Sequence, residues 1–310
     1  MKSLAVVLEA PGELALRSLA LDAEDPADVV VDVEWTGISA GTERLLYRGE
    51  MPAFPGMGYP LVPGYETVGR VAQADAGGTF AVGQRVFVPG ASCFGEIRGL
   101  FGGAASRLTV PGSRISRIDD SLGEQGVLLA LAATAQHALA GGEVPELIVG
   151  HGVLGRLLAR IAVAGGASPV VWEKNPLRAS GANGYRVMHP DEDARRDYRS
   201  IYDVSGDASL LGPLLGRLGR GGEIVLAGFY PGELSFPFPL AFMKEARLRV
   251  AAEWKPPDLD VVLTRLRDKT LDLDGLISHR RSFDEAAEAY ETAFADPGCV
   301  KMVLDWRSCE

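Results

Sequence analysis

The chain has 310 residues, of which 47% are hydrophobic and 23% are charged, and its net charge is −10. This length favours two domains, and the acidic balance argues against a nucleic-acid partner, whose phosphates would repel the surface. The three cysteines, Cys93, Cys299 and Cys309, show neither CxxC spacing nor disulfide density, which is typical of a reducing compartment.

The first third of the chain predicts a strand-rich domain. Residues 1–13 (MKSLAVVLEAPGE) indicate a strand and a turn, without the apolar region and cleavage site of a signal peptide. A glycine- and proline-rich stretch at 49–64 predicts a long, stiff loop. Further short strands are predicted at 29–35, 67–71, 85–88 and 107–110, which together favour a small β-barrel.

From about residue 121 the pattern changes to helices alternating with strands. Ser121 is expected to cap a helix, with Glu124 in the capping-box position. The apolar stretch 126–140 is interrupted by Gln136 and His137 and is too short to span a bilayer. The alternation predicts a doubly wound parallel sheet, with a helix at 153–165 and strands at 146–149, 169–172, 186–188, 201–204, 223–226 and 248–252. A last strand, at 300–306, is expected to return to the N-terminal domain.

The most informative motif is GHGVLG at 150–155, which lies between a predicted strand and a predicted helix. Its glycines permit a tight turn, close approach of a pyrophosphate and close packing of helix on strand, and the helix N-terminus attracts phosphates. A glycine-rich turn without a ligand is the alternative. Because both flanking elements are predicted, the motif indicates dinucleotide binding by Gly150, His151, Gly152, Val153, Leu154 and Gly155.

Glu173 ends the strand that follows the glycine motif. A carboxylate at this position accepts hydrogen bonds from the adenosine ribose and repels the 2′-phosphate of NADP, so NAD is the expected cofactor. Lys174, the next residue, could partly neutralise that repulsion. A solvated surface acid is the alternative interpretation of Glu173.

The chain resembles the medium-chain dehydrogenase/reductase superfamily along nearly its whole length. Besides the glycine motif, the resemblance is carried by GISAGTE (37–43), PGYETVG (63–69), VGQRV (82–86) and ATAQHA (133–138). It implies a GroES-like β-barrel substrate domain with an inserted Rossmann doubly wound parallel sheet. The expected limits are 1–120 with 254–310 for the GroES-like domain and 121–253 for the Rossmann NAD-binding domain.

Longer stretches narrow the resemblance to one branch of that superfamily. They resemble the bacteriochlorophyllide a dehydrogenases of bacteriochlorophyll synthesis at residues 37–66, 93–108, 128–141 and 148–160. This resemblance implies NAD-dependent oxidation of the 3-(1-hydroxyethyl) group of a chlorin or bacteriochlorin to a 3-acetyl group.

The chain departs from the superfamily at its zinc ligands. Those positions hold Ser39, Tyr65 and, near the helix, Leu129 or Ala130. Glu66 alone retains a carboxylate, and one carboxylate cannot hold a four-coordinate zinc ion. The lobe that binds structural zinc is also missing, and Cys93 stands alone there. No metal is therefore expected.

Without a metal, a side chain must accept the proton of the alcohol. Tyr65 is the first candidate, since nearby positive charge, including that of an oxidised nicotinamide ring, lowers a phenol pKa from about 10. Plain loop packing is its alternative role. Thr42 aligns approximately with a proton-relaying hydroxyl of the superfamily, or it stabilises a turn. Glu66 is a further catalytic candidate, although a structural bond to an arginine near the cofactor is favoured. His137 is expected to be a core histidine.

Other candidates follow from the resemblance and from residue type. Thr134 and Leu154 are expected to flank the nicotinamide. Parallel sheets bind ligands at the carboxyl ends of their strands, where this chain has Ser205, Gly206, Ala227 and Gly228. Aromatic and thioether side chains suit a flat macrocycle, and the candidates are Met51, Phe54, Met57, Tyr59, Phe94, Leu100 and Phe101, with ordinary burial as the alternative. Candidates for a substrate propionate are Arg44, Arg98 and Arg107.

The hypothesis is an NAD-dependent alcohol dehydrogenase acting on a tetrapyrrole. It is expected in the cytoplasm, at the periphery of the photosynthetic membrane, as a homodimer without an integral membrane segment. Two alternatives stay open, a zinc-free quinone or enone reductase and a non-catalytic dinucleotide-binding protein. Glu173 argues against the first, and the lack of a charged tail or interaction segment argues against the second.

Overall fold

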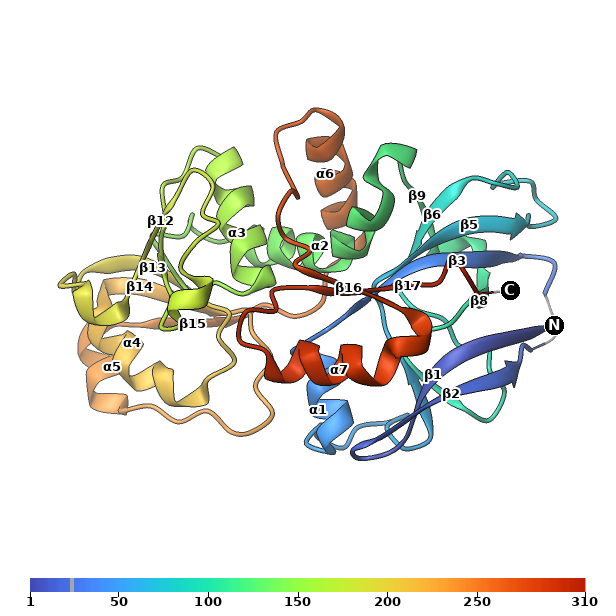
Figure 1. The fold of residues 1–310 in the computed structure, drawn as a ribbon. Coiled ribbons are helices and arrows are strands. Elements are labelled where there is room, and N and C mark those ends of the chain that lie inside the picture. The colour runs from blue at the N-terminus through green and yellow to red at the C-terminus, as the bar shows by residue number, and fades with distance from the viewer. Residues whose placement is uncertain (23–24, 310) are drawn as a thin grey trace. The chain divides into compact units, whose positions relative to one another are not determined.

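The computed structural model describes residues 1–22 and 25–309, which fall into two compact units (Figure 1). We call them the β unit, Met1–Ala130 with Ile277–Glu310, and the Rossmann unit, Leu131–Leu276. Compared with the expected domain limits, residues 121–130 group with the β unit and residues 254–276 with the Rossmann unit. One contact that ties the latter segment to the Rossmann unit is the hydrogen bond between His137 Nδ1 and Asp258 Oδ2, at 2.9 Å.

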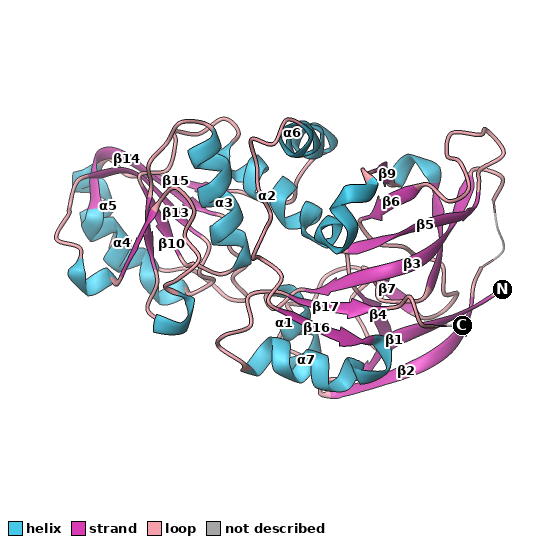
Figure 2. Ribbon diagram, turned by 45° about the horizontal axis from the view of Figure 1, so that its top comes forward, coloured by secondary structure: helices cyan, strands magenta, loops and turns pink. Residues whose placement is uncertain are grey.

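The β unit contains two sheets of short strands (Figure 2). One has the order β2-β1-β4-β7, and the other has the order β16-β17-β3-β5-β6-β9, with β8 paired to β3. Their bounds are β1 (Lys2–Ala10), β2 (Glu13–Ala20), β3 (Asp28–Ile38), β4 (Leu61–Pro63), β5 (Thr67–Gln73), β6 (Arg85–Val88), β7 (Arg98–Leu100), β8 (Arg107–Pro111), β9 (Ser116–Arg117), β16 (His279–Ser282) and β17 (Met302–Asp305). The strand-rich N-terminal domain is thereby confirmed, although β4 shortens the loop predicted at 49–64.

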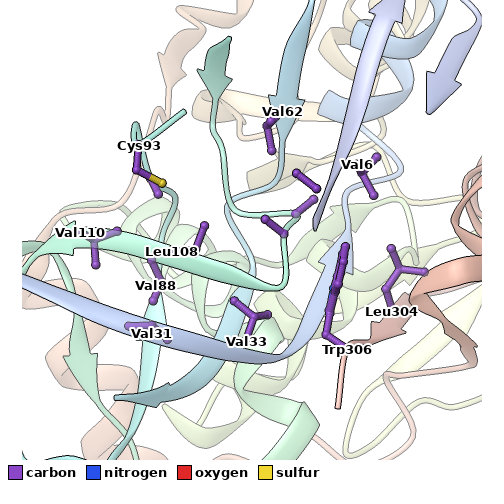
Figure 3. Packing of buried hydrophobic residues seen from close by; sticks show 14 of the residues in the cluster. Val6, Val31, Val33, Val62, Val88, Cys93, Leu108, Val110, Leu304 and Trp306 are labelled. Carbon is purple, nitrogen blue, oxygen red and sulfur yellow. The ribbon is translucent and has the colours of Figure 1, made fainter. Parts of the chain in front are cut away.

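Apolar side chains from both sheets form the core of the β unit (Figure 3). Val6 of β1 and Val33 of β3 are buried there, together with Trp306, which follows β17. The indole Nε1 of Trp306 donates to the Thr36 hydroxyl at 2.9 Å, so its polar atom is satisfied inside the core. Strand β17 pairs antiparallel with β3. The predicted return of the last strand to the N-terminal domain is confirmed.

The helical segments of the β unit are short. They are α1 (Thr42–Arg48), α7 (Ala286–Ala295) and the 3₁₀ segments η1 (Gly112–Arg114), η2 (Asp120–Leu128) and η6 (Phe283–Glu285). Helix α2 (Leu129–Leu139) follows η2 directly and leads into the Rossmann unit.

The helix expected to begin at Ser121 begins differently. Asp119 is the capping residue, because its carboxylate accepts a hydrogen bond from the Ser121 backbone N–H at 2.8 Å. The segment that follows is 3₁₀ and is interrupted at Gly123, whose φ is 48°. Glu124 does not reach back to a cap, since its carboxylate binds the guanidinium of Arg280 at 2.5 Å. The predicted capping box is therefore wrong.

The Rossmann unit is built on six parallel strands in the order β12-β11-β10-β13-β14-β15, which is typical of dinucleotide-binding sheets. The strands are β10 (Leu147–Val149), β11 (Val170–Trp172), β12 (Arg186–Met188), β13 (Tyr198–Asp203), β14 (Leu218–Leu226) and β15 (Arg247–Val250). Helices cover both faces, α3 on one and α4 with α5 on the other (Figures 1 and 2). Their bounds are α3 (Val153–Ala164), α4 (Leu211–Arg217), α5 (Phe238–Lys244) and α6 (Pro256–Arg267). The predicted doubly wound parallel sheet is confirmed.

The connection from β11 to β12 is unusual for such a sheet. Residues 173–185, all of which the structure describes, contain the 3₁₀ turn η3 (Pro176–Arg178) but no α-helix. Two further 3₁₀ turns are η4 (Pro190–Glu192) and η5 (Ala208–Leu210). Among the described residues, no helix combines the length and the apolar character needed to cross a lipid bilayer.

Candidate functional site: a dinucleotide loop and a buried hydroxyl pair

The glycine motif lies where strand β10 ends and helix α3 begins. Gly150 has a φ of +104°, a conformation that favours glycine. A Cβ on Gly155 would lie 2.0 Å from the carbonyl oxygen of Gly150, so no larger residue fits between loop and helix. A Cβ on Gly152, in contrast, would meet no atom within 4 Å. This open space beside the N-terminus of α3 fits the pyrophosphate of a dinucleotide.

Glu173 lies beside this loop. Its Oε2 accepts a hydrogen bond from the backbone N–H of His151 at 3.1 Å, and its Oε1 accepts one from the backbone N–H of Asn175 at 2.8 Å. The carboxylate is half-buried and fixed in direction, whereas Lys174 is exposed. This geometry suits the role proposed for Glu173, which is to bind the adenosine ribose.

The carboxyl ends of β13 and β14 bring the other cofactor candidates together. The hydroxyl and the backbone N–H of Ser205 both donate to Asp203 Oδ1, at 2.6 and 2.9 Å. The backbone N–H groups of Ala227 and Gly228 donate to the Asp203 carbonyl oxygen. Gly206 has a φ of +70°. Candidates on the helices, Thr134 of α2 and Leu154 of α3, are half-buried.

In the β unit, two hydroxyl groups lie at the positions where the superfamily resemblance places zinc ligands. Ser39 follows β3 and Tyr65 follows β4, and their side-chain oxygens are 2.6 Å apart. Thr42, at the start of α1, also hydrogen-bonds Tyr65. The Tyr65 ring packs edge-on against Phe101, with 5.2 Å between ring centroids. Tyr65, Thr42 and Phe101 therefore form one cluster.

The pKa of Tyr65 moves in the opposite direction to the one expected. Burial raises it well above the usual value for a phenol, and the negative charges of Glu66 and Glu43 raise it further. The hydrogen bonds from Ser39 and Thr42 offset only part of this shift. At neutral pH the protein's own residues therefore keep Tyr65 as a phenol, able to donate and to accept a hydrogen bond.

Glu66 is paired with a lysine, so the expectation that it bonds an arginine is wrong. Lys301 Nζ donates to Glu66 Oε2 at 2.6 Å and to the Ile38 carbonyl oxygen at 3.1 Å. Both side chains are almost fully buried, at 0% and 1% exposure. Gly37 permits this contact, since a Cβ there would lie 2.2 Å from Glu66 Oε2. Glu66, the residue that follows Tyr65, thus forms a buried charge pair with Lys301.

A second buried acid, Glu43, was not anticipated from the sequence. Its Oε1 accepts a hydrogen bond from the Ser39 backbone N–H at 3.1 Å, and its Oε2 accepts one from the Tyr290 hydroxyl at 2.6 Å. Burial raises the pKa of Glu43 to about 7, and the charge of Glu66 adds to this effect. The polarity of GTER at 41–44 gives no sign of burial, and Tyr290 and Lys301 lie more than 200 residues away in the chain.

These residues do not fit a zinc ion. Ser39 and Tyr65 bond to each other, and Lys301 neutralises Glu66. Within residues 1–22 and 25–309, no group of three or more His, Cys, Asp or Glu side chains is placed to hold a metal. Cys93 lies in the core of the β unit, where burial raises its thiol pKa to about 11. Zinc independence itself stays a proposal.

The residues proposed to contact substrate divide into two groups. Phe54 and Arg98 are exposed and Phe101 is half-buried. The exposed Arg44 belongs to α1, and Arg98 donates to the Tyr59 carbonyl oxygen at 3.4 Å. The other candidates pack inward: Met51, Met57, Tyr59 and Leu100 against the apolar side of α1, and Phe94 in the core of the β unit.

One assignment to the substrate site is corrected by its burial. Phe94 is 4% exposed and cannot form part of a wall that faces a ligand. Arg107 binds Asp32 of β3 at 2.5 Å, and both side chains remain partly exposed, so its role as a propionate partner stays a prediction. His137, expected to be a core histidine, is partly exposed and pairs with Asp258.

Comparison with known proteins agrees with this arrangement. The family description "Alcohol dehydrogenase GroES-like domain" matches residues 25–120. Over the whole length of both chains, the protein is 55% identical to the 2-desacetyl-2-hydroxyethyl bacteriochlorophyllide A dehydrogenase of Rhodobacter capsulatus.

Solved structures with lower identity share the fold. A zinc-binding dehydrogenase from Sinorhizobium meliloti 1021 bound to NADP has a TM-score of 0.82 at 22% identity, covering 98% of this chain and 99% of that one. An alcohol dehydrogenase from Escherichia coli CFT073 complexed with NADH has a TM-score of 0.82 at 21% identity, with the same coverage.

The GroES-like and Rossmann units, the glycine loop and the full-length similarity lead to one assignment. The protein is an oxidoreductase acting on CH–OH groups, and its cofactor is a nicotinamide dinucleotide. The chain belongs to the 2-desacetyl-2-hydroxyethyl bacteriochlorophyllide A dehydrogenase family.

Proposed function

We propose that this protein uses NAD to oxidise the 3-(1-hydroxyethyl) group of a bacteriochlorophyllide, or of a related chlorin, to the 3-acetyl group. The observation that carries the proposal is 55% identity, over the full length, to a dehydrogenase named for that substrate. The preference for NAD over NADP rests on Glu173, whose carboxylate is held beside the glycine loop by two backbone N–H groups.

The reaction removes a hydride and a proton from one carbinol. A bound nicotinamide supplies the hydride acceptor, and Gly150, Gly152 and the N-terminus of α3 would hold its pyrophosphate. Removal of the proton falls to residues of this chain. For this step the carbinol oxygen would have to lie within hydrogen-bond reach of the Ser39–Tyr65 hydroxyl pair.

Tyr65 acts as a relay in this proposal, because its raised pKa disfavours the phenolate. As the carbinol O–H gives its proton to the Tyr65 oxygen, the phenol passes its own proton to the Thr42 hydroxyl, to which it is hydrogen-bonded. The half-buried Thr42 hydroxyl then releases a proton to water. The products are the acetyl group, the reduced nicotinamide and one proton in solution.

The test is absorption spectroscopy of a hydroxyethyl chlorin mixed with NAD and the purified protein. Conjugation of a new acetyl group with the macrocycle should shift its long-wavelength band while reduced nicotinamide appears. Tyr65→Phe should bind NADH as the unmodified protein does and lower the turnover rate by about tenfold or more. Turnover of small quinones with NADPH, and none of the chlorin, would favour a quinone reductase. NADH binding without any turnover would favour a non-catalytic protein.

We further propose that residues 50–60 form one wall of the substrate site. Phe54 is 41% exposed, on a segment stiffened by Pro52, Pro55 and Pro60, so ordering it on binding costs little entropy. Phe54→Ala should raise the KM for the macrocycle by about tenfold, leaving the Kd for NADH and the thermal midpoint nearly unchanged. Tyr59→Ala is the contrasting variant, since Tyr59 packs on the cluster under α1 and its loss should lower stability. If Phe54→Ala changes the stability but not the KM for the macrocycle, residues 50–60 do not form a wall of the substrate site.

A homodimer is the proposed assembly. Strand β15 is an edge of its sheet, and edge strands with exposed apolar side chains tend to pair with another chain. Val250 on β15 is 74% exposed, and α5 adds Phe238 and Phe242 at 67% and 71%. Val250→Lys should convert a dimer to a monomer in sedimentation velocity, whereas Val82→Lys, also on an exposed valine, should not. The proposed location is the cytoplasm, peripheral to the photosynthetic membrane, where a lipophilic macrocycle is available.

A further inference from the structure

His151, the second residue of the glycine motif, uses all of its polar groups to hold other segments. Its backbone N–H donates to Glu173 Oε2 at 3.1 Å, and its carbonyl oxygen accepts from Arg156 Nε at 3.0 Å. Its ring Nδ1 lies 2.6 Å from the carbonyl oxygen of Arg178, and Nε2 lies 2.8 Å from the Tyr185 hydroxyl. The side chain is fully buried. The ring therefore faces the connection between β11 and β12 rather than the solvent.

The partners of the ring determine which nitrogen carries the proton. A carbonyl oxygen can only accept, so Nδ1 is the protonated nitrogen and donates to Arg178. Nε2 is then an acceptor and receives the hydrogen bond of the Tyr185 hydroxyl. Burial and the charge of Arg156 lower the pKa of His151 to about 4, which keeps the ring in this neutral form at physiological pH.

Arg156 completes the arrangement from the first turn of α3. Its Nη2 donates to the carbonyl oxygens of Arg178 and Ser180, at 3.0 and 2.8 Å, while its Nε holds His151. The guanidinium lies so close to Gly181 that a Cβ there would be 2.2 Å from Nη1. The side chain is 4% exposed, so these three bonds are formed away from bulk water.

These hydrogen bonds take the place of a crossover helix between β11 and β12. Parallel strands such as β11 and β12 need a crossover, which is usually an α-helix packed on the sheet. Residues 173–185 contain no α-helix, so they have no apolar helical face to anchor them. Hydrogen bonds from His151, Arg156 and Tyr185 anchor this segment instead, and the same segment begins with Glu173.

We infer that His151, Arg156 and Tyr185 form a clamp that fixes residues 173–185, and with them the Glu173 carboxylate, in the position needed to bind the adenosine ribose. These three are positioning residues, because they act through Glu173 and through the glycine loop. The inference rests on the dinucleotide-binding part of the proposed function. It extends that function by assigning cofactor affinity to side chains buried behind the loop.

The test is Tyr185→Phe, which removes the hydroxyl that donates to His151 and that is also hydrogen-bonded to the Arg160 side chain. Without this hydrogen bond, the His151 ring and residues 173–185 can adopt alternative positions. The Kd for NADH, measured by fluorescence titration, should rise by about fivefold to tenfold. The KM for NAD should rise similarly while kcat at saturating NAD stays unchanged, a split that general destabilisation does not produce.

Tyr202→Phe is the matched control. Tyr202 is buried in the same sheet, and its hydroxyl donates to a backbone carbonyl, that of Glu143, at 2.6 Å. Glu143 lies in the segment before β10, away from the carboxyl ends of the strands, so this variant should lose stability without changing the Kd for NADH.

Each outcome separates the two ideas. An unchanged Kd for NADH in folded Tyr185→Phe, or an equal change in Tyr202→Phe, overturns the clamp and leaves the proposed function standing. Normal NADH binding by the unmodified protein without chlorin oxidation overturns the proposed substrate and leaves the clamp standing. Absence of NADH binding by the unmodified protein overturns both.

Discussion

Buried ionisable side chains near Tyr65 make the stability of the β unit depend on pH. Glu43, Glu66 and Lys301 are all buried, and two carboxylates share the neighbourhood of one ammonium group. Burying a charge without a partner is costly, and Glu43 avoids this cost by holding a proton up to a pH of about 7. Its protonation should therefore appear in the stability of the whole protein.

Glu43→Gln tests this at the residue scale. Between pH 4.5 and about 7 the folded protein holds a proton on Glu43 that the unfolded chain has released, so the unfolding free energy should fall as pH rises through that window. The glutamine amide can still accept from Ser39 and donate to Tyr290. The variant should show a shallower slope, since Glu66, whose pKa burial also raises, still contributes to it. It should be more stable than the unmodified protein at pH 8, by on the order of 2–3 kcal/mol.

The measurement is urea unfolding from pH 5 to pH 8, with the exposed Glu96→Gln as the control. Parallel pH profiles for Glu43→Gln and the unmodified protein would show that Glu43 is already ionised in the native state.

In the proposed function, one side chain, Glu173, also decides the choice between NAD and NADP. Glu173→Ser removes the carboxylate that would repel a 2′-phosphate, so the ratio of kcat/KM for NADP to that for NAD should rise by about tenfold or more. Lys174→Ala should move the same ratio the other way, since it removes a neighbouring cation. An unmodified protein that already uses both cofactors equally would contradict the role given to Glu173.

At the scale of single elements, two glycines of the same loop have different roles: Gly155 is needed for packing and Gly152 for cofactor binding. A methyl group on Gly155 would collide with the Gly150 carbonyl, whereas one on Gly152 would enter open space. Gly155→Ala should thus lower the unfolding free energy by about 1–3 kcal/mol. Gly152→Ala should change it by less than about 1 kcal/mol and still weaken NADH binding by at least about tenfold, because the methyl group occupies the pyrophosphate position.

Thermal unfolding and NADH titration of both variants check this contrast. Equal NADH affinity in Gly152→Ala and the unmodified protein would place the pyrophosphate elsewhere.

How far the sequence predicts these elements depends on the range of the contacts that form them. Alternating or continuous apolar residues predicted the strands, and the spacing of glycines predicted the dinucleotide loop, because both patterns are local. The cap at Asp119 was missed because Asp119 and Ser121, which can both cap a helix, are only two residues apart. Glu124 also matched a capping box, but it binds the distant Arg280 instead. Lys301, Tyr290 and the Tyr185 hydroxyl could not be predicted as partners of Glu66, Glu43 and His151, since only the tertiary fold brings them together.

At the scale of the whole molecule, the proposed chemistry needs no zinc. Elemental analysis should find clearly less than one zinc per chain, and a chelator should leave turnover intact, because Ser39, Tyr65 and the lysine-bound Glu66 cannot complete a tetrahedral site. Stoichiometric zinc whose removal abolishes turnover would refute this expectation.

The pairing of Glu66 with Lys301 also bears on the order in which the chain folds as it is synthesised. The two residues are 235 positions apart, so at about 5–20 residues per second a ribosome makes Lys301 roughly 12 to 47 seconds after Glu66. During that interval Glu66 lacks the cation that makes its burial tolerable, and β3 lacks its neighbour β17. The Rossmann unit, by contrast, is continuous in the chain and complete by residue 276. The pairing of Lys301 with Glu66 and that of β17 with β3 therefore wait until the last strand has left the ribosome.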